Sequence, residues 1–362
     1  MIVIPSSKQK GENMYYGNQN PFERDSYDVI MCRDARKAFS RFHFGILAYI
    51  GSAYLISFFI SIFLAIILGE AYITLTENYI FQWVMGVLPM YAIGLPLLYM
   101  IVRTMPKKSF VKSKMSLGEF ISLFALSQFL MLVGNYIGTT VNAFFGAMLG
   151  EEITNSTSEL IESSPVWLTL VIAVIIGPII EELIFRKLML DRLSRYGNVL
   201  AIFVSGISFG LFHGNLYQFF YSALLGILLA YITVKTGNWL YSVAMHVMIN
   251  FFGSVAALPA IDRINEFYES LEAFESGAAI DIRSFMLGGM AVFSYVLFTY
   301  GVAIAGLIVL VLGIKNRRFR IRNDAHVNIP RDDSLDVAVF NVGTIIFIIV
   351  SLIFFALNIF LV

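Results

Sequence analysis

The segment GPIIEELIFR, residues 177–186, places two adjacent glutamates, Glu181 and Glu182, inside a long apolar stretch. Residues 166–180, VWLTLVIAVIIGPII, contain no charged side chain, and LIF follows the pair before Arg186. A stretch of this length and composition predicts a membrane-spanning helix. Because a charged side chain inside a bilayer costs at least ~2.5 kcal/mol, the pair of carboxylates indicates a structural or functional role.

The composition places the whole chain in a membrane. Of its 362 residues, 58% are hydrophobic and only 14% are charged, with a formal net charge of zero. Soluble domains contain about a quarter charged residues. The fold class that follows is an all-α, polytopic bundle of transmembrane helices whose partner is the lipid bilayer, and nothing indicates nucleic acid as a partner. Cys32 is the single cysteine, so the chain cannot form an internal disulfide.

Nine stretches qualify, or nearly qualify, as helical spans of about 20 residues. They are residues 44–69, 79–102, 117–149, 165–190, 198–213, 215–234, 239–260, 285–314 and 338–362. Lys and Arg gather in the first 43 residues and then in every second loop, whereas the alternate loops are free of them or dominated by acids. Since positively charged loops stay in the cytoplasm, we expect a cytoplasmic N-terminus and an external C-terminus.

These spans divide the chain into five parts. They are a cytoplasmic tail (1–43), three N-terminal transmembrane helices (44–150), a core with polar motifs (160–255), an external loop (261–284) and two C-terminal transmembrane helices (285–362).

Helical spacing separates the two glutamates. Residues four apart share a helix face, so Glu182 is expected to pair with Arg186, while Glu181 points away from that arginine. Pro178 removes a backbone hydrogen bond just ahead of the pair and predicts a kink.

Two more polar patches follow in the core. FGLFH puts Phe209 and His213 on one helix face, and HVMIN puts His246 and Asn250 on another. A single intramembrane histidine or asparagine more often holds helices together. Three such patches that must all avoid lipid are expected to meet, which favours a functional site. The remaining histidines, His43 and His326, flank the spans and are expected to be solvated.

The side chains suit peptide-bond hydrolysis. A carboxylate and a histidine on either side of one water can act as general base and acid. A second histidine and an asparagine amide can donate hydrogen bonds to a developing oxyanion. Alternatively, Glu181, His213 and His246 could bind Zn²⁺, because two histidines and a carboxylate form a known catalytic ligand set.

The motifs EELIFR, FGLFH and HVMIN, in this order, resemble those of the CPBP family of intramembrane proteases across about residues 160–255. This family comprises the type II CAAX prenyl endopeptidases and bacterial relatives linked to bacteriocin processing and self-immunity. The resemblance implies that Glu181 and His213 activate water and that His246 and Asn250 stabilise the oxyanion, with Glu182, Arg186 and Phe209 in support. The substrate would be a membrane-associated peptide or protein, either a CAAX-type C-terminus or a leader peptide.

Many members of this family are named metalloproteases, yet a metal-free mechanism without a cofactor is the preferred interpretation here, because asparagine is a poor zinc ligand. The resemblance also suggests a bacterial plasma membrane. Counted along the spans, Glu181 and His246 lie nearer the cytoplasmic side, so we expect an active site that opens toward the cytoplasm. His213 lies deeper, and the site closes only if its span starts later than residue 198 or is tilted.

Two other classes of protein compete with the protease. A non-catalytic immunity or scaffold protein could bind a peptide in the same cavity. A transporter is less favoured, because no internal repeat with paired broken helices is visible. Asn135, Thr139 and Asn142 could line a substrate cavity in any of these proteins, but Gly134 and Gly138 beside them indicate a helix-packing seam.

Overall fold

The computed structural model describes residues 21–151, 153–277, 281–321, 325–327 and 329–360, and every element within them is helical. The N-terminal half comprises α2 (Pro21–Leu68), α3 (Ala71–Thr76), α4 (Tyr79–Pro89), η1 (Met90–Gly94), α5 (Leu95–Val102), α6 (Leu117–Leu149) and α7 (Ser156–Ser163). The segment with the two glutamates contains α8 (Val166–Thr169), η2 (Leu170–Ile176), α9 (Gly177–Glu182), η3 (Leu183–Met189), α10 (Leu190–Leu193) and η4 (Ser194–Tyr196). Then follow α11 (Asn198–Phe212), α12 (Leu216–Thr236), α13 (Leu240–Gly253), α14 (Leu258–Glu275), α15 (Ile282–Lys315), η5 (Arg331–Asp333), α16 (Ser334–Val339) and α17 (Val342–Phe360).

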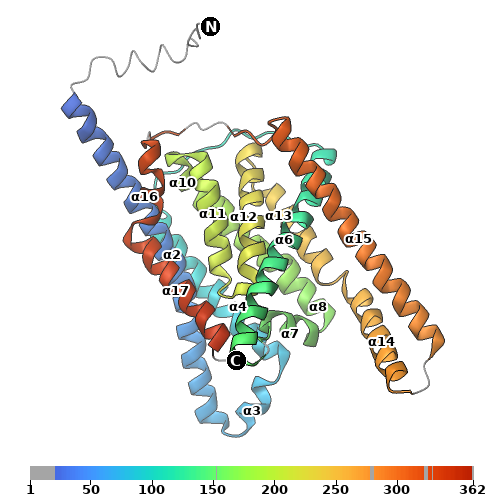
Figure 1. Ribbon diagram of the computed structural model, residues 1–362. Coiled ribbons are helices and arrows are strands. Elements are labelled where there is room, and N and C mark those ends of the chain that lie inside the picture. Colours follow the sequence, from blue (N-terminus) through green and yellow to red (C-terminus); the bar gives the residue numbers. More distant parts are fainter. Residues whose placement is uncertain (1–20, 152, 278–280, 322–324, 328, 361–362) are drawn as a thin grey trace.

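The helices form a bundle in which α11, α12 and α13 lie at the centre, between α2 and α17 on one side and α6 and α15 on the other (Figure 1). Within the described residues, seven helical stretches are long and apolar enough to cross a membrane, and α11 and α13 are shorter apolar helices. Each of the nine predicted stretches overlaps one of these helices. The predicted class, a polytopic helical membrane protein, is confirmed, while nine crossings and a cytoplasmic N-terminus stay predictions.

The predicted glycine seam joins α6 to α12. A Cβ atom on Gly134 would lie 2.4 Å from the Tyr221 Cα, and one on Gly138 would lie 2.9 Å from the Leu216 carbonyl oxygen. The absence of side chains therefore lets the two backbones touch. Asn142 is buried on this seam, where its Nδ2 donates to the Gly138 carbonyl. Thr139 and Asn142 line a separate pocket of about 420 Å³ beside the seam, whereas Asn135 is exposed and does not line it.

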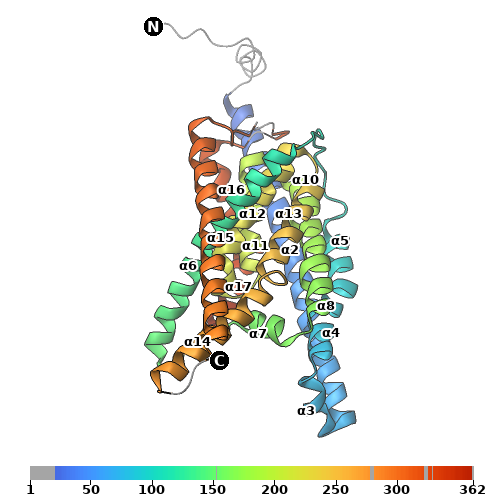
Figure 2. The same cartoon turned by 90° about the vertical axis from the view of Figure 1, so that its right-hand side faces the viewer.

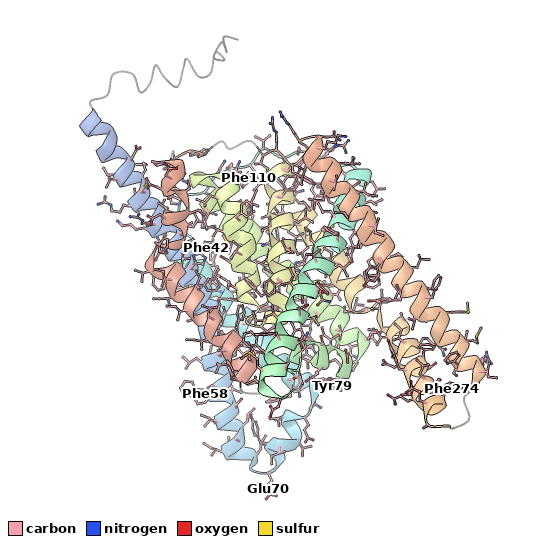
Figure 3. The ribbon with its side chains drawn as sticks, viewed as in Figure 1. Phe42, Phe58, Glu70, Tyr79, Phe110 and Phe274 are labelled. Carbon is pink, nitrogen blue, oxygen red and sulfur yellow. The ribbon has the colours of Figure 1, made fainter. Side chains whose placement is uncertain are left out.

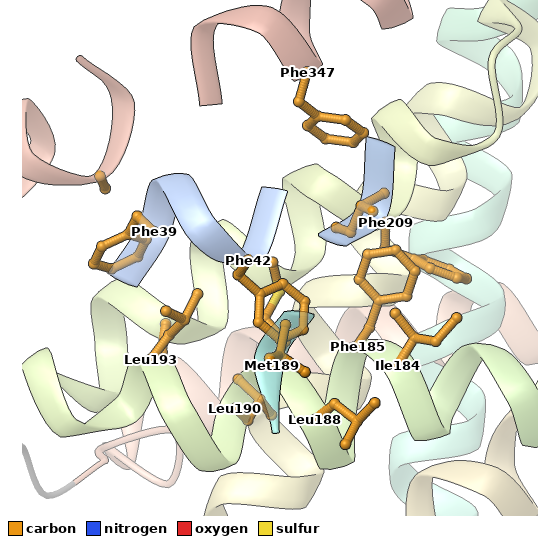
Figure 4. Packing of buried hydrophobic residues seen from close by; sticks show 14 of the residues in the cluster. Phe39, Phe42, Ile184, Phe185, Leu188, Met189, Leu190, Leu193, Phe209 and Phe347 are labelled. Atoms are coloured by element: carbon orange, nitrogen blue, oxygen red, sulfur yellow. The ribbon is translucent and has the colours of Figure 1, made fainter. Parts of the chain in front are cut away.

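The first helix begins well before residue 44, where the first span was predicted to start. Helix α2 runs without a break from Pro21 to Leu68, and its N-terminal half buries an apolar stripe that includes Ala35, Phe39 and Phe42. Figure 4 shows Phe39 and Phe42 beside side chains of the glutamate segment. This spacing of three and four residues is that of an amphipathic helix. The charged residues between the apolar ones lower the average hydropathy, so a hydropathy count did not detect this part of the helix.

His43 belongs to this buried stripe, so its predicted solvation is wrong. It is 1% exposed, and its Nε2 lies 2.9 Å from Ser208 Oγ while its Nδ1 lies 2.8 Å from Thr344 Oγ1. The ring thus joins α2 to α11 and α17. Burial is possible because both ring nitrogens have hydrogen-bond partners. His326 is exposed, as predicted.

The predicted external loop at 261–284 is largely helical. Helix α14 ends at Glu275 and packs antiparallel against the start of α15, where Gly288 meets the Phe267 side chain. The many acidic residues of α14 masked its apolar face in the sequence. Residues 278–280 of the predicted loop lie outside the described residues.

The bundle has two distinct ends. The start of α2, α10 and α16 lie at one end, and α3, α7 and α14 lie at the other (Figures 1 and 2). Phe110, in the connection between α5 and α6, lies at the first end, whereas Glu70 and Phe274 lie at the second (Figure 3). Because the Lys- and Arg-rich segments follow α5, α10 and α15, we call the first end the basic end.

Candidate active site

The two glutamates lie in a distorted helix. Pro178 stands in the first turn of α9, and wide helical turns of the π type flank α9 as η2 and η3. Such turns form where a regular hydrogen bond is lost and are frequent at functional sites. A third wide turn, η1, follows Pro89 and carries Tyr91. The kink expected at Pro178 is therefore part of a longer irregular stretch.

Glu182 and Arg186 form the ion pair that their spacing predicts. Arg186 Nε lies 3.1 Å from Glu182 Oε2, and neither side chain is exposed. The guanidinium also reaches Ser205 Oγ at 3.3 Å and lies over the Phe209 ring at 4.8 Å. A buried charge without a partner is costly, and these contacts compensate both members of the pair.

Glu182 has a second partner, which the sequence did not predict. Its Oε1 lies 3.1 Å from His246 Nδ1, while His246 Nε2 lies 3.7 Å from Glu181 Oε2. A carboxylate only accepts hydrogen bonds, so it selects the tautomer of His246 that carries its proton on Nδ1. In that tautomer, the lone pair of Nε2 faces Glu181.

His213 is oriented in the same way by the backbone. Its Nδ1 lies 2.7 Å from the Phe209 carbonyl oxygen, which can only accept, so Nδ1 carries the proton and Nε2 is left with a lone pair. The Phe209 ring packs edge-on against both histidines, with centroid distances of 4.7 Å to His213 and 5.7 Å to His246. Phe209 is 1% exposed and separates the two rings from Arg186.

Asn250 is tied to the distorted helix. Its Nδ2 donates to the Ala173 carbonyl oxygen in η2 at 2.9 Å. An amide nitrogen carries two protons, so one N–H is committed to this contact and the other is available. The sequence predicted the face that Asn250 shares with His246 but not this contact with Ala173.

Glu181, His213, His246 and Asn250 all line one cavity of about 360 Å³. Glu181 is the most accessible carboxylate of the site, with 22% of its side chain exposed, whereas Glu182 is fully buried. The cavity is also lined by aromatic and amide side chains from other helices, namely Trp83, Tyr91, Gln218 and Tyr221. The helix-face argument therefore placed the polar residues correctly in one space.

His213 reaches the cavity of Glu181 although α11 begins at Asn198, as predicted. The preceding helix does not end at residue 190 but continues through α10 and η4 to Tyr196. The contacts of Ser205 with Phe185 and Arg186 put Glu181 level with Phe209 on two antiparallel neighbours, and His213 lies about one helical turn further on, where it lines the same cavity. A late start or a strong tilt of α11 is not needed.

The same side chains are the candidate ligands for a metal ion. Within the described residues, no three His, Cys, Asp or Glu side chains are grouped so that they could hold a metal ion. Each histidine uses Nδ1, toward Glu182 or toward the Phe209 carbonyl, which leaves both Nε2 atoms as possible ligands. Glu181, His213 and His246 are not drawn together as a ligand cluster in this arrangement, so we derive no step through a metal, and the metal-free mechanism stays a prediction.

Comparison with known proteins agrees with the three motifs. Residues 163–252 match the family model described as type II CAAX prenyl endopeptidase Rce1-like. This part of the chain is similar to that family. Among curated proteins, "Putative membrane peptidase YdiL" of Bacillus subtilis (strain 168) is 27% identical over 165 residues, which cover 45% of this chain and 67% of that protein. No solved structure is significantly similar to the chain.

These matches confirm the resemblance to the CAAX-type proteases. They support an integral membrane protein that is an intramembrane protease, and hence a hydrolase, with a peptide substrate at the membrane. The matched region contains all three motifs and with them Glu181, His213, His246 and Asn250, whereas Trp83 and Tyr91 of the same cavity lie outside it.

Proposed function

We propose that the protein is an intramembrane endopeptidase that hydrolyses a peptide bond of a membrane-associated substrate with water activated by Glu181 and His213. The observation that supports this most is the arrangement of Glu181, His213, His246 and Asn250 around one cavity, with both histidines presenting Nε2 lone pairs. A leader peptide and a CAAX-type C-terminus are both substrates of this chemical class.

In the proposed reaction, the Glu181 carboxylate takes a proton from water while His213 Nε2 accepts the second hydrogen bond of that water. The oxygen attacks the carbonyl carbon of the substrate, and the carbonyl becomes an oxyanion. General-base catalysis of this kind contributes typically a hundredfold to ten-thousandfold. The proton on Glu181 later passes to the nitrogen of the leaving amine, so that the C–N bond breaks and Glu181 is again a carboxylate.

His246 completes the proton path. Its Nε2 lies 3.7 Å from Glu181 Oε2, which is longer than a hydrogen bond, so the two groups must move closer before Nε2 takes the proton temporarily and becomes a donor; the proton returns to Glu181 before the amine leaves. The protonated ring and the second N–H of Asn250 then donate to the oxyanion. Glu182 holds the ring in place through Nδ1 during this change.

Replacement of Asn250 by alanine should separate an enzyme from a peptide binder. The lost donor serves mainly the transition state, so turnover should fall roughly a hundredfold with little change in substrate binding. The measurement is steady-state kinetics on purified protein with a cleaved peptide. Asn341→Ala is a matched control, because the Asn341 amide donates to the Val337 and Ala338 carbonyls and Asn341 does not line the cavity.

A purely binding role would give a different pattern. The wild type would then cleave none of the peptides that it binds, and Asn250→Ala would weaken binding instead of turnover.

Activity should persist after chelation of metals. The donors around Glu181 do not form a metal cluster, so we expect the purified protein to keep its rate after treatment with EDTA or 1,10-phenanthroline and to contain much less than one zinc per chain. Zinc content is measured by inductively coupled plasma mass spectrometry. One zinc per chain, with activity lost on removal and restored on addition, would contradict the metal-free mechanism.

A further inference from the structure

The cavity walls extend from the glutamates toward one end of the bundle only. Beyond the catalytic residues, the lining includes Trp83 near the start of α4, Ile161 in α7 and Ser254 after α13. Trp83 Nε1 donates to Ser164 Oγ at 2.8 Å, which ties the start of α4 to the α7–α8 junction. These elements lie at the end opposite the basic end (Figures 1 and 2).

Toward the basic end, the site is closed by packed side chains. Phe185, Arg186, Leu229, Ser242 and Met245 all have no exposed surface. Within this layer, Ser242 Oγ donates to the Leu229 carbonyl at 2.8 Å, and Arg186 is paired with Glu182. A peptide could not pass this layer without separating the central helices.

The connection between α5 and α6 covers the helix ends above that layer. Ser113 N donates to the Thr236 carbonyl at 2.7 Å, and Met115 N donates to the Tyr241 hydroxyl at 3.3 Å. Lys108, which is 3% exposed, donates to Asn198 Oδ1 at 2.9 Å. Residues 103–116 therefore bridge α11, α12 and α13 and add a second cover on the basic side.

Charge distinguishes the open end from the closed one. The described residues 153–165, which lead into the open wall, include the exposed Glu159 and Glu162 and no Lys or Arg. No Lys or Arg side chain is among the cavity-lining residues within the described part of the chain, whereas Glu181 is. A negatively charged segment would lose its hydration there without gaining a cationic partner, so it is disfavoured.

We propose that the substrate enters from the non-cytoplasmic face, as an extended peptide segment that is neutral or basic around the scissile bond. The proposal replaces the expected cytoplasmic opening. The direction of entry follows from the direction of the cavity and from the rule that Lys- and Arg-rich loops stay in the cytoplasm. The statement about the substrate rests on the proposed function. Tyr91, Tyr221 and Trp83 supply apolar and aromatic surface for the side chains of such a segment.

Thiol accessibility tests the direction of entry independently of catalysis. In a Cys32→Ser background, Ser254→Cys places the single thiol on the cavity wall. Ser163→Cys on the exposed end of α7 and Ser113→Cys beside α12 provide reference thiols at the two ends. Each variant is treated with a membrane-impermeant methanethiosulfonate carrying a trimethylammonium group, in right-side-out and in inside-out vesicles.

The expected result is modification of the Ser254→Cys and Ser163→Cys variants in right-side-out vesicles only, and of the Ser113→Cys variant in inside-out vesicles only. For each reagent, the rate of reaction with the Ser254→Cys variant is divided by the rate of the same reagent with free cysteine. This ratio should be higher for the trimethylammonium reagent than for its sulfonate analogue. Modification of the Ser254→Cys variant only from the inside, or from neither side, would overturn the proposed entry, and a faster sulfonate reaction would overturn the charge preference.

The location of cleaved bonds tests the substrate half of the proposal. Peptide ends that depend on Glu181 should map to non-cytoplasmic segments of membrane-anchored chains, and ends that map to cytoplasmic segments would contradict it. If no peptide end depends on Glu181, the proposed protease function fails, while the thiol experiment still decides whether the cavity opens to that face.

Discussion

Glu181→Gln should remove hydrolysis, with a fall of roughly a thousandfold or more, and leave a folded protein in the membrane. Glutamine has nearly the same shape but cannot accept a proton from water, so the general base is lost. Glu181 is partly exposed to the cavity and has no cationic partner as close as the one that Glu182 has, so its neutralisation should cost little stability. Product formation by the purified variant is followed by mass spectrometry, and folding is followed by size-exclusion chromatography and thermal unfolding.

The outcome that would contradict this assignment is a Glu181→Gln protein with at least a tenth of the wild-type rate. A variant that fails to accumulate would instead show that Glu181 is structural. Tyr91→Phe offers a comparison within the same cavity, because it removes a hydroxyl group and leaves Glu181 and Glu182 in place. It should keep most of the activity.

Glu182→Gln should lower both stability and activity. The substitution leaves the fully buried Arg186 guanidinium without a counter-ion, and breaking a buried pair in this way typically costs about 3–5 kcal/mol. It also weakens the acceptor that holds His246 Nδ1. We expect a clearly lower midpoint of thermal unfolding, less protein in the membrane and a turnover at least tenfold below the wild type.

Two further variants separate these effects. Glu119→Gln neutralises one member of the partly exposed Lys235–Glu119 pair, where at most about 1 kcal/mol is expected. The double variant Glu182→Leu/Arg186→Leu removes the buried pair without leaving a lone charge, so stability should recover toward the wild type while turnover stays low. Wild-type turnover in the double variant would show that Glu182 does not position His246.

The spacing of polar residues predicted much of the site. Because an α-helix repeats every 3.6 residues, the Glu182–Arg186 pair and the shared faces of Phe209 with His213 and of His246 with Asn250 followed from the sequence alone. The meeting of the three patches followed from the cost of polar groups in lipid.

The contacts of these groups across helices could not be predicted in the same way. Helical spacing says which face a side chain occupies but not the rotation of one helix against the next. The bond between Glu182 and His246, 64 residues apart, depends on that rotation, and so does the contact of Asn250 with Ala173.

The ends of the helices were less predictable than their existence. A hydropathy count stops where charges begin, so it missed the amphipathic half of α2, the burial of His43 and the acidic helix α14. The direction in which the cavity opens depends on which side chains fill the space around the site. Phe185, Leu229 and Met245 close one side, and a hydrophobic pattern does not distinguish such a layer from lipid-facing residues.

The most direct test of the central claim is a comparison of peptide ends in membranes from cells with the wild type, Glu181→Gln or Glu162→Gln. Glu162 is an exposed glutamate of α7, so its substitution controls for the loss of a carboxylate outside the cavity. If Glu181 activates the water that hydrolyses a peptide bond, a set of new ends should occur with the wild type and Glu162→Gln and be absent with Glu181→Gln. Identical peptide ends in all three membranes, with equal amounts of the three proteins, would contradict the account.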